Sequence, residues 1–350
     1  MKSASLPILL LLAAVAFAIP GKAEILRPRV VTEASRKDTD DPALWIPADR
    51  SQTLVVGTDK HSDGALYVYD LEGKIVQRVG GLKRPNNVDI AYGLALGGRP
   101  VDIAVVTERE MGRLRVFALP DMRCVDKGDL VVFDGDKKRA PMGIALYTRP
   151  RDGAIFAIVA GKSGPAEGYL GQYLLEDDGD GQVKMTFVRQ FGSYSKQKEI
   201  EAIAVDNELG YVYCSDESVG IRKYAADPDA DRELALFGTG GFALDREGIS
   251  IYKINDGTGY ILVSDQQNNA FRIFPREGAP GDPHHHPLIK TVGVSTLESD
   301  GSEVTSTALP GYPNGLFVAM SNGKAFHYYS WDDIAGTDLK KAPDGVPPAE

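Results

Sequence analysis

The sequence has little cysteine and no excess of positive charge. Its two cysteines, Cys124 and Cys214, stand 90 positions apart, and neither belongs to a C-x-x-C metal or redox pattern. They could pair in an exported protein or remain two thiols in buried strands, and their spacing does not decide between these. Asp and Glu number 49 against 39 Lys and Arg, so the net charge is −10. This balance excludes nucleic-acid binding through a basic surface.

Helical periodicity and long apolar runs are also scarce. The exception is residues 1–23, where Lys2 precedes an apolar core from Leu6 to Phe17 and small residues follow. This is the pattern of a cleaved secretory signal peptide, and the run is short for an uncleaved membrane anchor. We therefore expect an exported protein, periplasmic or secreted, that makes no contact with a membrane. Cleavage after Ala23 leaves a net charge of −12.

The chain is rich in short segments with the composition of β-strands. β-Branched and aromatic residues fill segments such as Thr53–Thr58, Ala65–Asp70 and Gly259–Asp265, and Gly, Asp, Asn and Pro separate them. Hydrophobic residues make up 43% of the chain, which is enough to fill a core. The pattern predicts an all-β fold.

Six of these segments resemble one another, each with a turn-like polar start that leads into a strand. They are DDPALW (Asp40–Trp45), NNVDIAY (Asn86–Tyr92), PMGIALY (Pro141–Tyr147), IEAIAVD (Ile200–Asp206), REGISIY (Arg246–Tyr252) and PNGLFVA (Pro313–Ala319). Their anchors follow one another at steps of 46, 54, 59, 46 and 67 residues, counted from Ala43, Asp89, Gly143, Ala202, Gly248 and Gly315. A repeat of this order that holds about four strands is typical of propeller blades. The sequence therefore predicts a six-bladed β-propeller.

Blades must stack because one blade cannot bury both faces of its sheet. We expect one domain over residues 24–340, followed by a short tail at 341–350. An array of β-sandwiches is the alternative, but it does not explain why polar residues recur at one point of each repeat. In a propeller these points meet at one end of the central channel.

The residues that converge there are oxygen donors, without thiolates or imidazoles. The candidate metal ligands are Asp40, Asp41, Asn87, Asp89, Glu201, Glu217, Asp245, Glu247 and Asp300, and Asn86 belongs to the same turns. Singly, each could be a solvated turn cap. Together they favour several Ca²⁺ ions over Mg²⁺ or Mn²⁺, since crowded carboxylates repel one another without cations.

Three cations end equivalent strands of successive repeats. Lys60 follows LVVGTD, Arg109 follows DIAVVTE, and Lys162 follows FAIVAG. They could be solvated surface residues. If they meet the acidic residues at the same rim, cations beside bound metal form an anion site that suits phosphate.

The order and spacing of DDPALW, NNVDI, REGISIY and GYPNGLFVA resemble those of the β-propeller phytases, the alkaline, calcium-dependent 3-phytase family. DGALYVYDLEGK and GYILVSDQQNNAFRIF extend the resemblance, which covers Glu33 to Trp331. It implies a six-bladed propeller that hydrolyses phytate, myo-inositol hexakisphosphate, to lower inositol phosphates and inorganic phosphate with calcium. The implied partner is this small molecule, taken as its calcium complex by a monomer.

The resemblance also implies roles for single residues. Asp40 and Asp41 resemble the acidic pair near the channel, and Asn87 and Asp89 lie in a segment that contributes calcium ligands. The acidic positions around the catalytic calcium ions are matched by Glu201, Glu217, Asp245, Glu247 and Asp300. The family's phosphate-binding cations are matched by Lys60, Arg109 and Lys162. A metal-activated water, with Glu201 or Glu217 as its base, then attacks phosphorus directly.

The chain departs from the family pattern at three places. His61 stands where well-known members have a second lysine, Met142 stands where they have a phosphate-contacting tyrosine, and the loop with Asp300 is shorter and less acidic. These changes bear on metal occupancy and substrate affinity. They leave two other hypotheses open: a calcium-dependent propeller hydrolase of the lactonase kind, and a non-catalytic propeller that binds phosphate or sugar.

Overall fold

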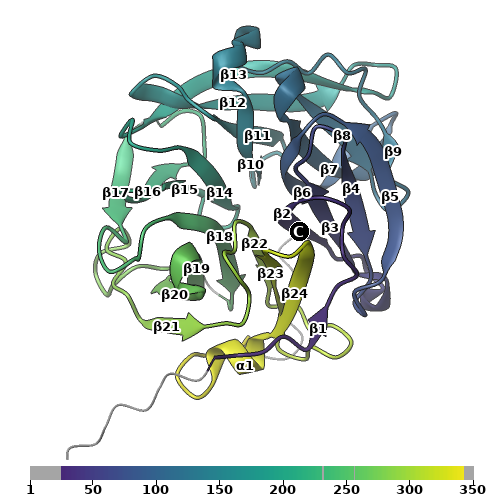
Figure 1. The fold of residues 1–350 in the computed structure, drawn as a ribbon. Helices are drawn as coiled ribbons and strands as arrows, with labels where there is room; N and C mark the ends of the chain where they lie inside the picture. Colours follow the sequence, from purple (N-terminus) through teal and green to yellow (C-terminus); the bar gives the residue numbers. More distant parts are fainter. Residues whose placement is uncertain (1–24, 231, 256, 343–350) are drawn as a thin grey trace, which may run out of the picture.

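Six four-stranded sheets surround one axis in the computed structural model, which describes residues 25–230, 232–255 and 257–342 (Figure 1). The predicted all-β, six-bladed propeller is confirmed. The predicted signal peptide lies outside the described residues. Within these ranges, no helix is both long enough and apolar enough to cross a membrane.

The first three blades follow the chain from the innermost strand to the outermost. Blade 1 contains β2 (Thr39–Trp45), β3 (Leu54–Asp59), β4 (Gly64–Tyr69) and β5 (Ile75–Leu82). Blade 2 contains β6 (Pro85–Leu96), β7 (Arg99–Glu108), β8 (Arg113–Ala118) and β9 (Arg123–Cys124). Blade 3 contains β10 (Pro141–Thr148), β11 (Ile155–Gly161), β12 (Glu167–Asp177) and β13 (Val183–Ser193).

The next two blades repeat this order, and the sixth departs from it. Blade 4 contains β14 (Ile200–Asp206), β15 (Tyr211–Asp216), β16 (Gly220–Ala225) and β17 (Glu233–Phe237). Blade 5 contains β18 (Arg246–Lys253), β19 (Gly259–Asp265), β20 (Ala270–Pro275) and β21 (Lys290–Gly293). Blade 6 contains β22 (Ser302–Thr305), β23 (Leu316–Ser321), β24 (Ala325–Ser330) and β1 (Val30–Val31).

In the described part of the chain, helical structure is confined to short connections. One α-helical turn, α1, spans Trp331–Ala335. The 3₁₀ turns are Arg50–Gln52, Arg109–Met111, Phe133–Gly135, Lys137–Arg139 and Gln266–Asn268.

The ring is closed by the two ends of the described chain. Val30 pairs with Tyr328 and Val31 with His327, so β1 becomes the outer strand of blade 6 (Figure 1). A hydrophobic cluster lies between each pair of neighbouring blades, including blades 6 and 1. Each blade therefore buries both faces against its neighbours, which is the reason a single sheet of this kind cannot stand alone.

The sixth sequence repeat was placed wrongly. PNGLFVA, with its anchor Gly315, leads into β23, which is the second strand of blade 6. The innermost strand is the four-residue β22, which carries Glu303. The step of 67 residues was long because it ran past β22, a strand too short and too polar to match the other five.

In the first five blades, the innermost strand has a β-bulge where the repeat begins. The register shifts between Thr39 and Pro42 in β2, and the same shift recurs in β6, β10, β14 and β18. Each bulge inserts one extra residue and redirects the side chains beside it. The residues within the bulges include Asp40, Asn86, Met142, Glu201 and Glu247.

Small residues are needed beside these bulges because neighbouring strands approach closely there. A Cβ at Gly143 would lie 1.7 Å from the carbonyl oxygen of Glu201, and one at Gly301 would lie 2.3 Å from a carboxylate oxygen of Asp41. Glycine therefore lets blades 3 and 4, and blades 6 and 1, meet at the end of the channel.

Candidate metal and phosphate site

Asn86 joins side chains from three blades. Its amide nitrogen lies 2.9 Å from an oxygen of Asp40 in blade 1 and 2.6 Å from an oxygen of Glu201 in blade 4, and it also contacts Asn87 at 2.9 Å. Its amide oxygen accepts a hydrogen bond from Arg109 at 3.1 Å. Repeat starts that are far apart in the sequence thus meet at one end of the channel.

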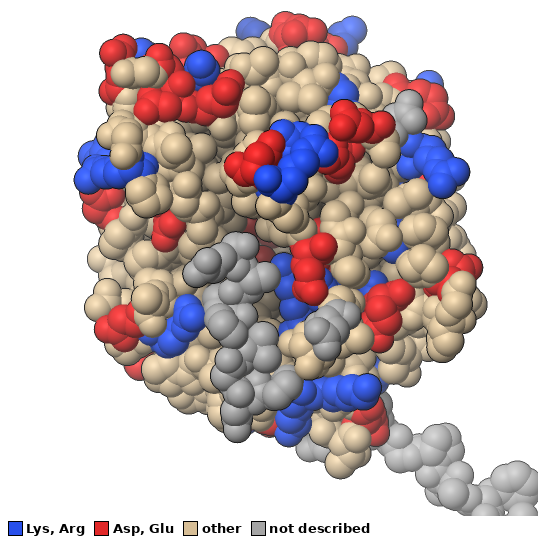
Figure 2. Space-filling view, turned by 180° about the vertical axis from the view of Figure 1, so that it is seen from behind, with Lys and Arg blue, Asp and Glu red and all other residues tan. Residues whose placement is uncertain are grey.

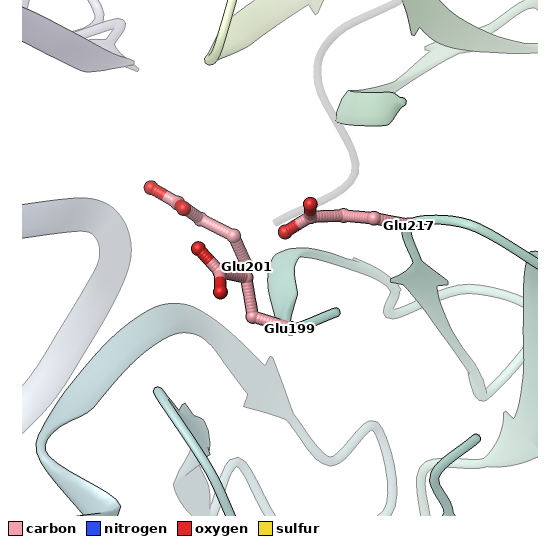
Figure 3. Close-up of side chains that lie close together, drawn as sticks. All are labelled: Glu199, Glu201 and Glu217. Carbon is pink, nitrogen blue, oxygen red and sulfur yellow. The ribbon is translucent and has the colours of Figure 1, made fainter. Parts of the chain in front are cut away.

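Next to this contact lie two groups of three carboxylates that share Glu217. Glu199, Glu201 and Glu217 form one group, and Glu217, Asp245 and Glu247 form the other. Within each group, one oxygen of every side chain lies within 4.8 Å of the others. In Figure 3 the carboxylate of Glu217, which follows β15, points toward the side chains of Glu199 and Glu201 at the beginning of β14.

Glu217, Asp245 and Glu247 are buried, and Glu199 and Glu201 are half-buried, with few positive charges beside them. Burial, together with the charges of Glu199 and Glu201, raises the pKa of Glu217 to about 8. Burial first, and then the carboxylates around it, raises the pKa of Glu247 well above its ordinary value, and burial also raises that of Asp40. The Oε1 atom of Glu217 is buried and has no hydrogen-bond partner among the described residues. The cluster is therefore short of cations.

The predicted phosphate-binding cations lie at the same rim and contact the cluster. Lys60 lies 2.6 Å from Asp40 and 2.5 Å from Asp300, and Gln266 also donates to Asp300 at 2.5 Å. Lys162 forms an ion pair with Glu199. Asp300 is thus brought into the cluster from blade 6, opposite the blade that supplies Lys162.

Arg109 has a neighbour that the sequence did not single out. Burial lowers the pKa of Arg109, and the nearby positive charge of Arg84 lowers it further. Neither guanidinium forms an ion pair with the residues that the structure describes. Two adjacent guanidiniums without a carboxylate partner are suited to bind an anion.

Two predicted ligands lie deeper in the channel. Asp41 accepts a hydrogen bond from the amide of Val88 at 3.1 Å, and Asp89 accepts one from the amide of Leu146 at 2.6 Å. Both line a central cavity of about 450 Å³ together with Glu303 and Lys253. Burial raises the pKa of Asp89 to about 6. Asp41 and Asp89 thus do not belong to the two carboxylate groups. Asn87 links the two places, because it lines the central cavity and also accepts the hydrogen bond from Asn86.

The turn between β13 and β14 contributes residues that sequence reasoning missed. Glu199 belongs to the first carboxylate group, and the ammonium of Lys198 lies 2.7 Å from Asp245 and 3.2 Å from Glu217. The alternation of Glu199, Ile200 and Glu201 could have indicated two carboxylates on one side. No pattern in the sequence marks Lys198.

The residues that depart from the family pattern offer little to a phosphate. Met142 is 1% exposed, and its thioether is a weak hydrogen-bond acceptor that carries no donor. His61 is exposed, and its Nδ1 accepts a hydrogen bond from the amide of Asp63 at 3.1 Å. Cys124 and Cys214 are free thiols, so the possible disulfide is not formed.

Charge is mixed over the outside of the molecule. Figure 2 shows acidic and basic side chains interspersed on the face seen from behind, without one continuous basic area among the atoms it colours.

The fold and the site define a six-bladed propeller that collects hard oxygen donors and cations at one end of its channel. The family model for phytase matches residues 10–344, and the chain therefore belongs to the phytase family. It is 31% identical over 328 residues to the 3-phytase of Bacillus subtilis strain 168, across 87% of this chain and 82% of that protein.

Solved structures support the fold at much lower sequence identity. A calcium-binding regucalcin from Agrobacterium tumefaciens superposes with a TM-score of 0.52 at 9% identity, over 88% of this chain and 95% of that one. Hydrazine synthase of Kuenenia stuttgartiensis gives a TM-score of 0.50 at 11% identity, over 90% of this chain and 99% of that one. At these identities the likeness concerns the propeller architecture alone.

Proposed function

We propose that this protein hydrolyses phytate to lower inositol phosphates and inorganic phosphate, and that it does so with calcium. Membership of the phytase family supports the reaction. Calcium dependence is supported by the two carboxylate groups that share Glu217. Lys60, Arg109 and Lys162 lie at the same rim.

The donor set suits calcium. Carboxylate and amide oxygens are the ligands that Ca²⁺ takes in numbers, and the buried, unpartnered oxygen of Glu217 lacks a cation or a donor. The proposed ligands are Asp40, Asn87, Glu199, Glu201, Glu217, Asp245, Glu247 and Asp300, with Asp41 and Asp89 as ligands in the channel. When bound, the metal neutralises phosphate charge and lowers the pKa of a water molecule.

The side chains around this site have distinct tasks. Lys60, Arg109 and Lys162 bind the oxygens of the phosphate that is cleaved, where negative charge is spread in the transition state. Glu201 or Glu217 accepts the proton of the attacking water. Because phytate and this protein are both acidic, the cations and the metal are needed to make the local charge favourable for binding.

We further propose that the protein is exported and works as a monomer with one domain over residues 24–340. The apolar segment before Ala23 supports export. The hydrophobic clusters that link all six blades support a single domain.

The test is inorganic phosphate release from phytate by the wild type, Glu201→Gln and Glu72→Gln, each with calcium and with a chelator. Glu72 is exposed, so its variant is the matched control for loss of one carboxylate. We expect calcium-dependent release that is lost in Glu201→Gln and kept in Glu72→Gln. Release that is equal in chelator and calcium would refute the metal part. Phytate binding without turnover would refute the enzymatic part.

A further inference from the structure

Lys198 has an unusual pair of neighbours for a surface lysine. Its ammonium lies 2.7 Å from Asp245 and 3.2 Å from Glu217, two of the three side chains of the second carboxylate group. The Lys198 side chain is 43% exposed, whereas that of Glu217 is 2% exposed. A half-exposed cation at the rim thus places its charge against carboxylates buried in the cluster.

The backbone that carries Lys198 is held in place. Ser195 donates from its amide and its hydroxyl to Asp216 at 2.9 and 2.6 Å, and the hydroxyl of Tyr194 donates to the carbonyl of Lys198. Next to it, Glu199 turns to the other carboxylate group and pairs with Lys162. The anchored turn therefore fixes the position from which the lysine side chain reaches the carboxylates.

The other two lysines at the rim pair with other carboxylates and do not neutralise Glu217 or Asp245. Lys60 pairs with Asp40 and Asp300, and Lys162 pairs with Glu199. Within the described residues, Lys198 is the cation that forms ion pairs with Glu217 and Asp245. A divalent ion that takes these two carboxylates as ligands has to compete with the ammonium of Lys198 for their negative charge.

We propose that Lys198 is a built-in competitor for the metal at the group formed by Glu217, Asp245 and Glu247. Its ammonium stabilises the metal-free carboxylates, is displaced when an ion binds, and so sets the calcium concentration at which this group fills. The inference rests on the metal part of the proposed function, and it concerns a residue that takes no part in the reaction itself.

The test measures calcium binding by titration calorimetry on the full chain, without substrate. Lys198→Ala and Lys198→Gln remove the competing charge. Lys196→Ala is the matched control, because Lys196 is exposed on the same turn and its loss changes the net charge equally. Lys198→Arg keeps the charge.

We expect calcium to bind about tenfold more tightly to Lys198→Ala and Lys198→Gln than to Lys196→Ala, and Lys198→Arg to remain near the wild type. Melting in a chelator supplies a second readout. The Lys198→Ala protein should melt at a lower temperature than the Lys196→Ala protein, and calcium should raise its melting temperature by more.

The outcomes separate this inference from the proposed function. If calcium binds the wild type and binds Lys198→Ala no more tightly than Lys196→Ala, the competitor role is refuted and the metal site stands. If calcium binds none of these proteins, the metal part of the proposed function fails together with it.

Discussion

Replacing Asn86 with Asp tests the central contact of the site with almost no change of shape. The amide nitrogen of Asn86 now donates to Asp40 and Glu201 at 2.9 and 2.6 Å. A carboxylate in the same position places a third negative oxygen against both. In the metal-free protein the new group must either stay charged beside two carboxylates or take up a proton.

The cost can be estimated from the second alternative. Holding a carboxyl protonated at pH 7, about three pH units above its reference pKa, costs about 4 kcal/mol. The electrostatic repulsion of the charged form cannot cost more than this, because the group would then take up a proton instead. A protonated carboxyl donates one hydrogen bond where the amide can donate two, and a lost hydrogen bond to a charged group adds about 1.5–3 kcal/mol. We therefore expect Asn86→Asp to lose about 5.5–7 kcal/mol of unfolding free energy in a chelator.

Calcium should reverse most of this loss, because the added carboxylate lies where the cation deficit is and can serve as a further ligand. The assay is equilibrium urea unfolding with a chelator and with saturating calcium. Asn322→Asp is the control, since exposed Asn322 donates to Glu298 at 2.8 Å and the same charge change there costs about 0.5 kcal/mol or less. A loss of equal size with and without calcium would refute the placement of the ions at this cluster.

Three further results are expected. Arg109→Ala lowers kcat/KM for phytate at least tenfold, and unchanged kinetics would remove Arg109 from the site. Asp206→Asn breaks a fully buried pair with Arg276, with contacts of 2.5 and 2.7 Å, and costs about 3–5 kcal/mol in urea unfolding; a loss below about 1 kcal/mol contradicts this. Burial lowers the pKa of Lys223 to about 8. Between pH 8 and 10.5 the unfolded state therefore binds more protons, and the wild type gains about 3 kcal/mol relative to Lys223→Met. A difference that stays flat with pH contradicts this.

The sequence predicted the propeller because five inner strands share a strong local pattern. In each of these five repeats a polar turn precedes an apolar strand, and this pattern can be recognised within a few consecutive residues. The bulge that aims these polar residues was not predicted, because a bulge depends on the register between two strands. Blade 6 was misread because its innermost strand, β22, has only four residues. Its outermost strand, β1, has two residues and pairs with β24 from the other end of the described chain.

The convergence of residues in the repeats could be predicted from the sequence, whereas the two residues of the turn before β14 were missed. Asp40, Glu201 and Glu247 occupy equivalent bulges, so the period alone indicates that they converge. Lys198 and Glu199 come from the turn before a repeat, and turns between blades share no pattern. The separation of Asp89 from the cluster follows from strand alternation, which turns its side chain into the channel toward the amide of Leu146.

The pairing of the rim cations has a thermodynamic consequence for catalysis. In the metal-free protein, Lys60 and Lys162 are held by carboxylates that are also the proposed metal ligands. An ion that takes these carboxylates releases the lysines for phosphate, so calcium and phosphate should strengthen each other's binding. Linkage requires that the factor by which calcium tightens inorganic phosphate equals the factor by which phosphate tightens calcium. Both can be measured by titration, and a factor of one in either direction would show that the ion pairs at the rim do not compete with the metal.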